Sequence, residues 1–459
     1  MMLSPSVWAQ NNNNGNTDDT GGGDTTIIAG NLPGAGVVVD ALGVVSMKRI
    51  DGTGELSRRR RLEAKSKLDA NVAKASDSRK ISLNRLADAV RQSVDANQPI
   101  TDELKFLAGL TKIQHVFYYP ETKDIVIAGP AEGFMLDDME RPVGIFSGEP
   151  TLLLEDLVVA LRTFGPGVKR IGSVGCSIDP TQDGLQRMQD FLQDLSQRNL
   201  RPSDAEFIAD GLQKSLGLQE VTITGIPANT HFANILVEAD YRMKLIGIGL
   251  EVPPVRLKSY VERANAASLQ RNAMQRWYFV PDYETVCMSD DGLAAEIRGH
   301  GVKLVGANEL VRADGTRMET NRVDQASERF CQDFTKQYPN LAAKAPVYGQ
   351  LRNLIDMLIV AALIQNEGYY AEAGWDLGVL ADEGKFSVEV YAAPKQVDTA
   401  VNIVWKGSRL TTPVGGGVHI DARQAVSSAN IIPDQDGTVA ARHKEVSLQG
   451  LAQGQWWWD

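Results

Sequence analysis

The stretch Ile226–Glu251, IPANTHFANILVEADYRMKLIGIGLE, is the most clearly specified element in the chain. Its apolar residues recur at the spacing of one helix face. The members of this stripe are Phe232, Ile235, Leu236, Ala239, Met243 and Ile246. A side-chain oxygen of Asn229 or Thr230 can cap the start, and Gly247 or Gly249 can end the helix. We therefore expect a long helix that is buried on one face, with neighbouring strands packed on it.

The opposite face of this helix carries charged residues in two acid–base pairs. Each pair has the acid four positions before the base, which is the favourable order. The pairs are Glu238 with Arg242 and Asp240 with Lys244. We expect this face to be wet and its charges to satisfy one another along the helix. His231 and Tyr241 are then the side chains there without an evident structural role, and both are candidate site residues.

The composition limits the classes of protein to which this chain can belong. The chain has 459 residues, of which 43% are hydrophobic and 23% charged, as in an ordinary soluble globular protein with roughly two to four domains. A net charge of −11 argues against a dedicated nucleic-acid binder, because phosphate contacts need a basic surface. Residues 48–91 are an exception, with 13 Lys or Arg against 6 Asp or Glu. We expect a solvated basic helical segment there; the alternative is an arm that docks on an acidic surface.

Cysteine usage excludes a disulfide scaffold. Cys176, Cys287 and Cys331 form no C-x-x-C motif and allow one disulfide at most. The longest apolar stretch, Met357–Ile364, is far shorter than the ~20 residues that a membrane-spanning helix needs. We expect it to be part of a buried helix and predict no transmembrane span.

The first ten residues, MMLSPSVWAQ, contain a small-residue pattern, Val7-Trp8-Ala9, of the kind that signal peptidase cleaves. The charged and apolar regions of a signal peptide are missing, so either a leader is truncated or the match is chance. The following tract, Asn11–Asp24, is too polar to be buried, and such tracts often follow a cleavage site. We expect export to a periplasm-like compartment or the cell envelope, with a cytoplasmic location as the alternative.

The order of predicted elements indicates an α+β protein with a central mixed sheet, amphipathic helices, and then antiparallel strands with a two-helix segment. Strands and helices alternate through residues 113–250, whereas short strands separated by turns begin at Trp277. Further strands are expected at 386–391, 401–405 and 417–420. The predicted divisions are a leader and polar tract (1–26), a hairpin with the basic helical segment (27–110), a central domain (111–252), a C-terminal domain (253–425) and a polar tail (426–459).

Candidate chemistry is sparse. Cys176 lies in Gly-Cys-Ser at a predicted strand end before a helix, where nucleophiles are often displayed, but no G-x-S-x-G surrounds it. The five histidines show neither H-x-H nor H-E-x-x-H, so we predict no metal site, and the glycine clusters lack phosphate-loop patterns, so we predict no cofactor. Paired acids such as Glu155-Asp156 are interpreted as solvated unless two converge on one cleft.

Three tryptophans close the chain at Trp456, Trp457 and Trp458. A polar tail buries three indoles only by folding back onto the body, which we slightly favour. Otherwise they form an anchor for a protein, a sugar polymer or a lipid surface.

Several motifs resemble a known family. They are HVFYYPETKDIVIAGPAEGF, LLLEDLVVALRTFGPGV, GCSIDPTQDGL, EADYRMKLIGIGLE, RWYFVPDYETVCMSDDGLAAEIRGHGVKL and PVYGQLRNLIDMLIVAALI. Together they are similar to a family of exported planctomycete proteins that carry a domain of unknown function, over roughly residues 35–425. The resemblance implies export and one family-wide architecture. It implies no activity, cofactor or catalytic residue.

The leading functional hypothesis is a non-catalytic cell-envelope protein that binds or scaffolds a protein or envelope polymer. It depends on the apparent lack of a catalytic constellation, the leader-like start and the tryptophan tail. The alternative is a hydrolase whose active site is assembled only in the fold, with Cys176, His231 and nearby carboxylates as its first candidates. The sequence specifies no oligomeric state.

Overall fold

The computed structural model describes residues 36–48, 55–169, 172–199, 201–264, 273–311, 317–319, 324–402 and 414–459. The predicted leader and polar tract therefore lie outside the described residues, as does most of the strand expected at 401–405. Helices and mixed sheets together confirm the predicted α+β class.

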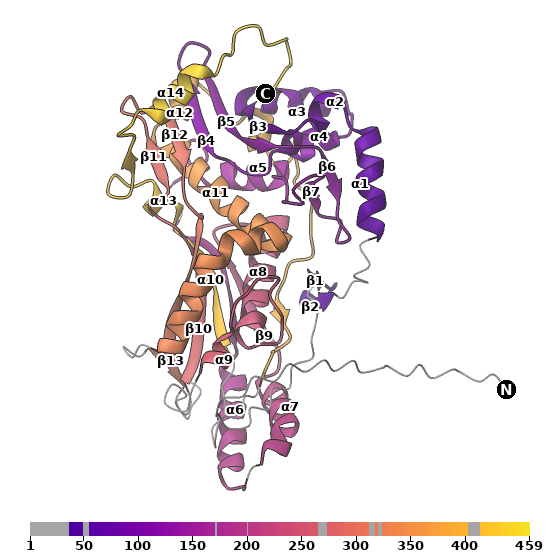
Figure 1. The fold of residues 1–459 in the computed structure, drawn as a ribbon, viewed down its shortest axis with the longest axis vertical. Coiled ribbons are helices and arrows are strands. Elements are labelled where there is room, and N and C mark those ends of the chain that lie inside the picture. Colours follow the sequence, from indigo (N-terminus) through magenta and orange to yellow (C-terminus); the bar gives the residue numbers. More distant parts are fainter. Residues whose placement is uncertain are drawn as a thin grey trace, which may run out of the picture.

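In the described part of the chain, nine strands form a mixed sheet that occupies the lower half of Figure 1. Most neighbours are antiparallel, but β16 runs parallel to β10, and β15 runs parallel to β2. In order across the sheet the strands are β1 (Gly36–Val39), β2 (Val44–Lys48), β15 (Gln396–Val397), β9 (Gln219–Thr224), β8 (Val174–Pro180), β16 (Val414–Ile420), β10 (Ala273–Pro281), β13 (Val302–Val311) and β14 (Arg317–Glu319).

A second sheet of seven described strands lies in the upper half of the molecule (Figure 1). Its order is β17 (Ile432–Pro433), β11 (Val286–Met288), β12 (Ala294–Ile297), β4 (His115–Tyr119), β5 (Asp124–Ala131), β3 (Ser76–Ser82) and β18 (Trp457–Trp458). A separate hairpin pairs β6 (Phe134–Leu136) with β7 (Pro142–Gly144). Each large sheet contains strands from both sides of residue 252, so the two halves of the chain are interleaved.

Helices cover the sheets and fill the space between them. They are α1 (Glu55–Lys67), α2 (Ala70–Ala73), α3 (Leu83–Asp95), α4 (Asp102–Lys105), α5 (Leu154–Thr163), α6 (Gln182–Ser196), α7 (Ala205–Leu216), α8 (His231–Gly247), α9 (Tyr260–Arg263), α10 (Gln325–Lys344), α11 (Pro346–Asn366), α12 (Tyr369–Ala373), α13 (Ala422–Ala425) and α14 (Thr438–Glu445). Helices α6 and α7 project together at the foot of the molecule (Figure 1).

Helix α8 is the predicted helix, capped by Thr230, whose hydroxyl accepts a hydrogen bond from the amide of Ala233. The expectation of a wet face is wrong. Every residue from Phe232 to Gly247 except Asn234 is buried, because β8 and β16 cover one side of the helix and α5 and α11 cover the other. Gly247 is required where the helix crosses the sheet, since a Cβ there would lie 2.0 Å from the ring of Trp277.

The charges predicted on α8 do pair, but in the interior. Lys244 donates to Asp240 over 2.8 Å and also to the carbonyl oxygens of Ile178 and Gly416. Arg242 lies 3.4 Å from Glu238. Buried charges are stable only with such partners.

Local predictions fail at several strands. Residues 386–391 form an extended segment without strand pairing, while β3 was not predicted. Strand β8 runs to Pro180, and the side-chain oxygen of Thr181 caps α6. The glycines at 415–417 belong to β16, where the backbone of β10 approaches too closely for a side chain at Gly416.

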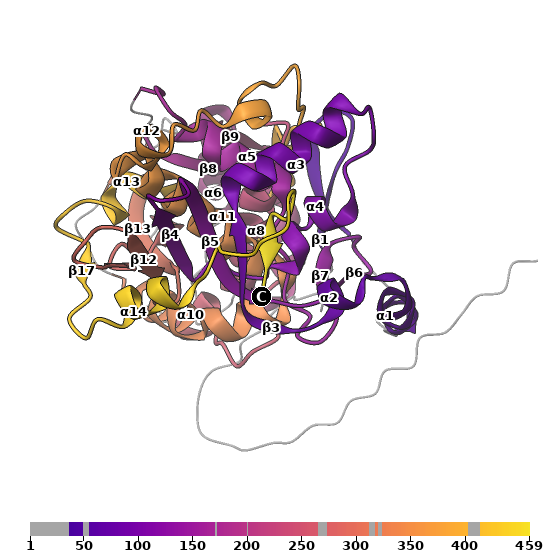
Figure 2. The same ribbon diagram turned by 90° about the horizontal axis from the view of Figure 1, so that it is seen from above.

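The C-terminal tail folds back, as the favoured interpretation predicted. Strand β18 pairs with β3, and the C-terminus lies beside β3 in the view from above (Figure 2). Arg79 is fully buried under the ring of Trp457 and donates to the carboxylate of Asp459 over 2.8 Å. The same guanidinium holds the carbonyl oxygen of Ala108, a residue with a positive φ of 50°.

Helix α11 contains the apolar stretch predicted to be buried. It is the one helix in the described part of the chain that is long and apolar enough to cross a membrane, and 94% of that window is buried inside the protein. Asp356 lies in its middle, 1% exposed, and neither carboxylate oxygen has a hydrogen-bond partner among the described residues. Burial raises the pKa of Asp356 to about 6, against the lowering effect of Lys112 and Arg352.

This raised pKa predicts a pH effect on stability. The folded state binds the proton of Asp356 more tightly than the unfolded state, so its contribution is present at low pH and is lost as pH rises through about 6. Asp356→Asn should remove about 1–2 kcal/mol of the stability loss that the wild-type chain shows between pH 5 and pH 8. Urea unfolding at both pH values measures this, with exposed Asp95→Asn as the control. Parallel pH curves for wild type and Asp356→Asn would contradict it.

Candidate functional site

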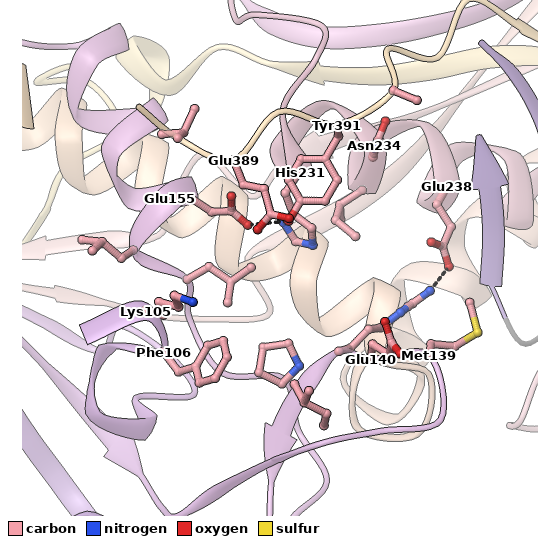
Figure 3. A pocket seen from close by; sticks show the side chains of 18 of the residues that line it. Lys105, Phe106, Met139, Glu140, Glu155, His231, Asn234, Glu238, Glu389 and Tyr391 are labelled. Carbon is pink, nitrogen blue, oxygen red and sulfur yellow. Dashed lines mark hydrogen bonds and ion pairs between the residues drawn. The ribbon is translucent and has the colours of Figure 1, made fainter. Parts of the chain in front are cut away.

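A cavity of about 730 Å³ opens where the first turns of α5 and α8 meet. Its other walls are the end of α4, the β6–β7 hairpin, strand β1 and the extended segment 386–392 (Figure 3). The volume is that of a typical small-molecule site. The lining mixes apolar residues with several charged ones, in contrast to the apolar core around it.

Two helix starts bring the polar residues of the cavity together. Glu155 and Asp156 lie in the first turn of α5, and His231 is the first residue of α8. Helix α5 packs against α4, α8 and α11, so its first turn lies among other helices. Glu155 is half-buried and Asp156 is buried, so the interpretation of this pair as solvated is wrong.

His231 and Asp156 form a hydrogen-bonded pair. The His231 Nδ1 atom lies 2.9 Å from Asp156 Oδ2. Burial acts to lower the pKa of His231, but the charge of Asp156 and its hydrogen bond outweigh burial, and the pKa is raised. The other carboxylate oxygen of Asp156 is buried without a hydrogen-bond partner among the described residues. This geometry holds the imidazole in one orientation.

The second ring nitrogen of His231 is engaged as well. Its Nε2 atom lies 3.4 Å from the amide nitrogen of Gln350 on α11. The amide oxygen of Gln350 accepts from Arg141 over 3.4 Å, and Arg141 donates to Glu238 over 2.6 Å. Because both of its ring nitrogens have contacts, His231 is better placed to change the pKa of neighbouring carboxyl groups than to take a proton from a ligand.

Glu155 is the carboxylate that faces the cavity. Tyr391, from the extended segment, donates its hydroxyl hydrogen to Glu155 Oε1 over 3.0 Å (Figure 3). Burial raises the pKa of Glu155 to about 7, and the negative charge of Asp156 adds to the rise. His231 and the Tyr391 hydrogen bond act in the opposite direction. Glu155 is therefore poised to gain or lose a proton near neutral pH.

Further polar groups surround Glu155. Glu389 lies beside it on the extended segment, and Lys105 stands across the cavity next to Phe106 (Figure 3). Asn234 lines the cavity from α8, and its side-chain oxygen is buried without a hydrogen-bond partner among the described residues. In the described ranges, no group of three His, Cys, Asp or Glu side chains is arranged to hold a metal ion.

Cys176 lies outside this cavity. It is in the interior of β8, 6% exposed, and pairs in register with Val418. Burial, with the nearby charge of Asp240, raises the pKa of its thiol well above the usual value, which is the opposite of what a nucleophile needs. All three cysteines are free and buried.

The remaining sequence candidates have structural contacts. Tyr241 is buried, donates its hydroxyl hydrogen to the carbonyl oxygen of Asp398, and does not line the cavity. Trp456 is buried, and Trp457 donates from its indole to Glu103 over 2.6 Å. Trp458 pairs with Lys80 across β18 and β3. Of the predicted site residues, His231 is the one that the fold places in the cavity.

Sequence reasoning missed Glu155, Glu389 and Tyr391 as site residues. The signal for Glu155 was the adjacent acid pair, which by itself is indistinguishable from a solvated helix start. Glu389 and Tyr391 lie 234 and 236 positions from Glu155 and in a segment predicted to be a strand. Only the path of that segment across the cavity brings them together.

Comparison with known proteins gives one match. A family model described as "Protein of unknown function (DUF1598)" matches residues 176–260. This range runs from β8 to the start of α9 and includes α8, with His231, Asn234 and Glu238 of the cavity. A domain of unknown function, as the sequence motifs implied, is thus present. The comparison with curated proteins found no match, and neither did the comparison with solved structures.

The contacts of Glu155 predict how its titration responds to substitution. Tyr391→Phe removes a hydrogen bond to the carboxylate and should raise the pKa of Glu155 by about half to one unit. Asp156→Asn removes a neighbouring negative charge and should lower it. NMR titration of selectively 13C-labelled glutamate measures both, with Tyr283→Phe, outside the cavity, as the control. A Glu155 pKa that is indifferent to both changes would contradict this electrostatic account.

Proposed function

We propose that the chain is a hydrolase of a small molecule and that Glu155 is its acid–base group. The observation that carries this proposal is a carboxyl group with a pKa of about 7 in a cavity of about 730 Å³. A general acid or base is most effective when its pKa lies near the working pH. Perturbed groups in a cavity are also typical of active sites.

The neighbouring residues have distinct roles in this proposal. Tyr391 positions the Glu155 carboxyl through its hydroxyl, and Asp156 with His231 sets the charge around it. Glu389 provides a second carboxyl group beside Glu155 (Figure 3). In hydrolysis by paired carboxyl groups, the protonated one supplies a proton to the leaving group, and the ionised one activates water or attacks. Glu155 is suited to the first role because its pKa is raised to about 7, and Glu389 is the carboxyl group beside it.

A substrate panel tests the proposal. Nitrophenyl glycosides, nitrophenyl esters and amino-acid nitroanilides release coloured products on hydrolysis, so one class should show turnover. For that class, kcat/KM should change with pH around 7, and Glu155→Gln should reduce it by about 10²–10⁴-fold. Exposed Glu121→Gln is the matched control and should retain full activity.

The outcome of this panel also distinguishes a hydrolase from the alternative, a non-catalytic binding protein. Binding of panel members without turnover would favour the non-catalytic binding protein that the sequence suggested. A projecting α6–α7 hairpin with Phe207 53% exposed supports that alternative, because an exposed aromatic side chain suits a protein partner. Full turnover in Glu155→Gln would refute the role of Glu155 itself.

We also propose export to the cell envelope, which the leader-like start and the family resemblance support. Purification from native cells, followed by mass mapping of the N-terminus, tests it. Export predicts a mature chain that begins after Ala9 and is recovered from the envelope fraction. An intact Met1 recovered from the cytoplasm would refute it.

A further inference from the structure

The cavity has an excess of hydrogen-bond acceptors and negative charge. Three glutamates, Glu140, Glu155 and Glu389, line it together with Lys105 and His231. Arg141 also lines the cavity, but its charge is taken by Glu238. No arginine or lysine among the described residues forms an ion pair with Glu140, Glu155 or Glu389. A ligand that fills the space therefore meets carboxylates whose charge the protein itself does not balance.

The charge of the cavity determines which ligand chemistry suits it. Carboxylates accept hydrogen bonds and attract positive charge, so the glutamates favour a ligand with N–H donors and a positive charge. A carboxylate or phosphate ligand would bring acceptors and further negative charge.

Aromatic faces complete the site. Tyr391 and Phe106 lie on opposite sides of the cavity, each next to a charged residue (Figure 3). Aromatic faces attract cations, with roughly 0.5–2 kcal/mol for each contact. Apolar residues such as Ile235 and Leu154 supply walls for the uncharged part of a ligand.

We propose that the cavity binds a small organic amine, protonated at neutral pH, with its ammonium group held by Glu155 and Glu389. This inference rests on the proposed function, since it names the substrate class of the same site. A simple amine has no bond to hydrolyse, so its binding tests the present inference alone, whereas the absence of turnover in the substrate panel would refute the hydrolase. The two proposals can therefore fail separately.

Binding should depend on pH because several groups at the site titrate. Four groups act directly on Glu155: Asp156 on α5, His231 on α8, and Glu389 and Tyr391 on the extended segment. The other titratable and charged residues that line the cavity are Lys105 on α4, Glu140 and Arg141 on the β6–β7 turn, and Glu238 on α8. As pH rises from 6 to 8, Glu155 loses its proton and the site becomes more negative. Loss of a proton from His231 acts in the same direction. Affinity for a permanently protonated amine should therefore rise by up to about tenfold.

A matched set of ligands tests the proposal by isothermal titration calorimetry on the full chain. Cadaverine, 1,5-pentanediol and glutarate share a five-carbon chain and carry two ammonium, two hydroxyl or two carboxylate groups. Cadaverine should bind most tightly and glutarate should not bind. Cadaverine stays doubly protonated at pH 6 and pH 8, so a change of affinity with pH reports the protein.

Two variants identify the residues involved. Glu155→Gln should weaken cadaverine binding about tenfold at pH 8 and abolish its pH dependence. Glu121→Gln, on an exposed turn, should bind like wild type, and thermal unfolding checks that both variants are folded. Three results would overturn the proposal. The diol or glutarate could bind as tightly as cadaverine, or cadaverine could fail to bind at 10 mM, which is on the order of the weakest affinity that the method measures. The third is a pH dependence that is unchanged in Glu155→Gln.

Discussion

The burial of α8 is the constraint on which the rest of this structure depends. A helix with alternating acids and bases lies between a nine-stranded sheet and two other helices, so each charge needs a partner in the interior. Asp240 and Lys244 satisfy each other, and Lys244 also reaches two strands through the carbonyl oxygens of Ile178 and Gly416. These contacts fix where the helix lies on the sheet. A displaced helix would leave a buried ammonium group without its acceptors, at a cost of several kcal/mol.

The same constraint builds the cavity at the start of the helix. Glu238 takes Arg141 from the β6–β7 hairpin as a partner, and Arg141 contacts Gln350 of α11, which reaches His231. This chain of polar contacts joins three elements that are distant in the sequence. It ends at Asp156, next to the carboxyl group whose pKa lies near neutrality. The polar contacts that pair the buried charges of the core therefore also contribute to the pKa of Glu155.

The turn that follows Phe106 has a strained backbone, and the C-terminal tail supports it. Leu107 and Ala108 have positive φ values directly after Phe106, a cavity residue, and the buried Arg79 holds the carbonyl of Ala108. Such conformations cost roughly 1–3 kcal/mol each and persist only where surrounding contacts enforce them. Asp459 and Trp457 supply those contacts from the end of the chain. The tryptophan tail, which suggested a free anchor, therefore supports the turn that carries Phe106.

The sequence by itself determined the α+β class, the helix that became α8 and its two ion pairs. These features follow from local periodicity, capping residues and i to i+4 spacing, which act within a few turns of chain. Only the tertiary structure decided that both faces of α8 are buried and that Glu155, Tyr391 and Glu389 share a cavity with His231. The physical reason is that the burial of Glu155 and its pKa depend on segments distant in the sequence, including His231 on α8 and the extended segment with Glu389 and Tyr391, and no local pattern records these contacts.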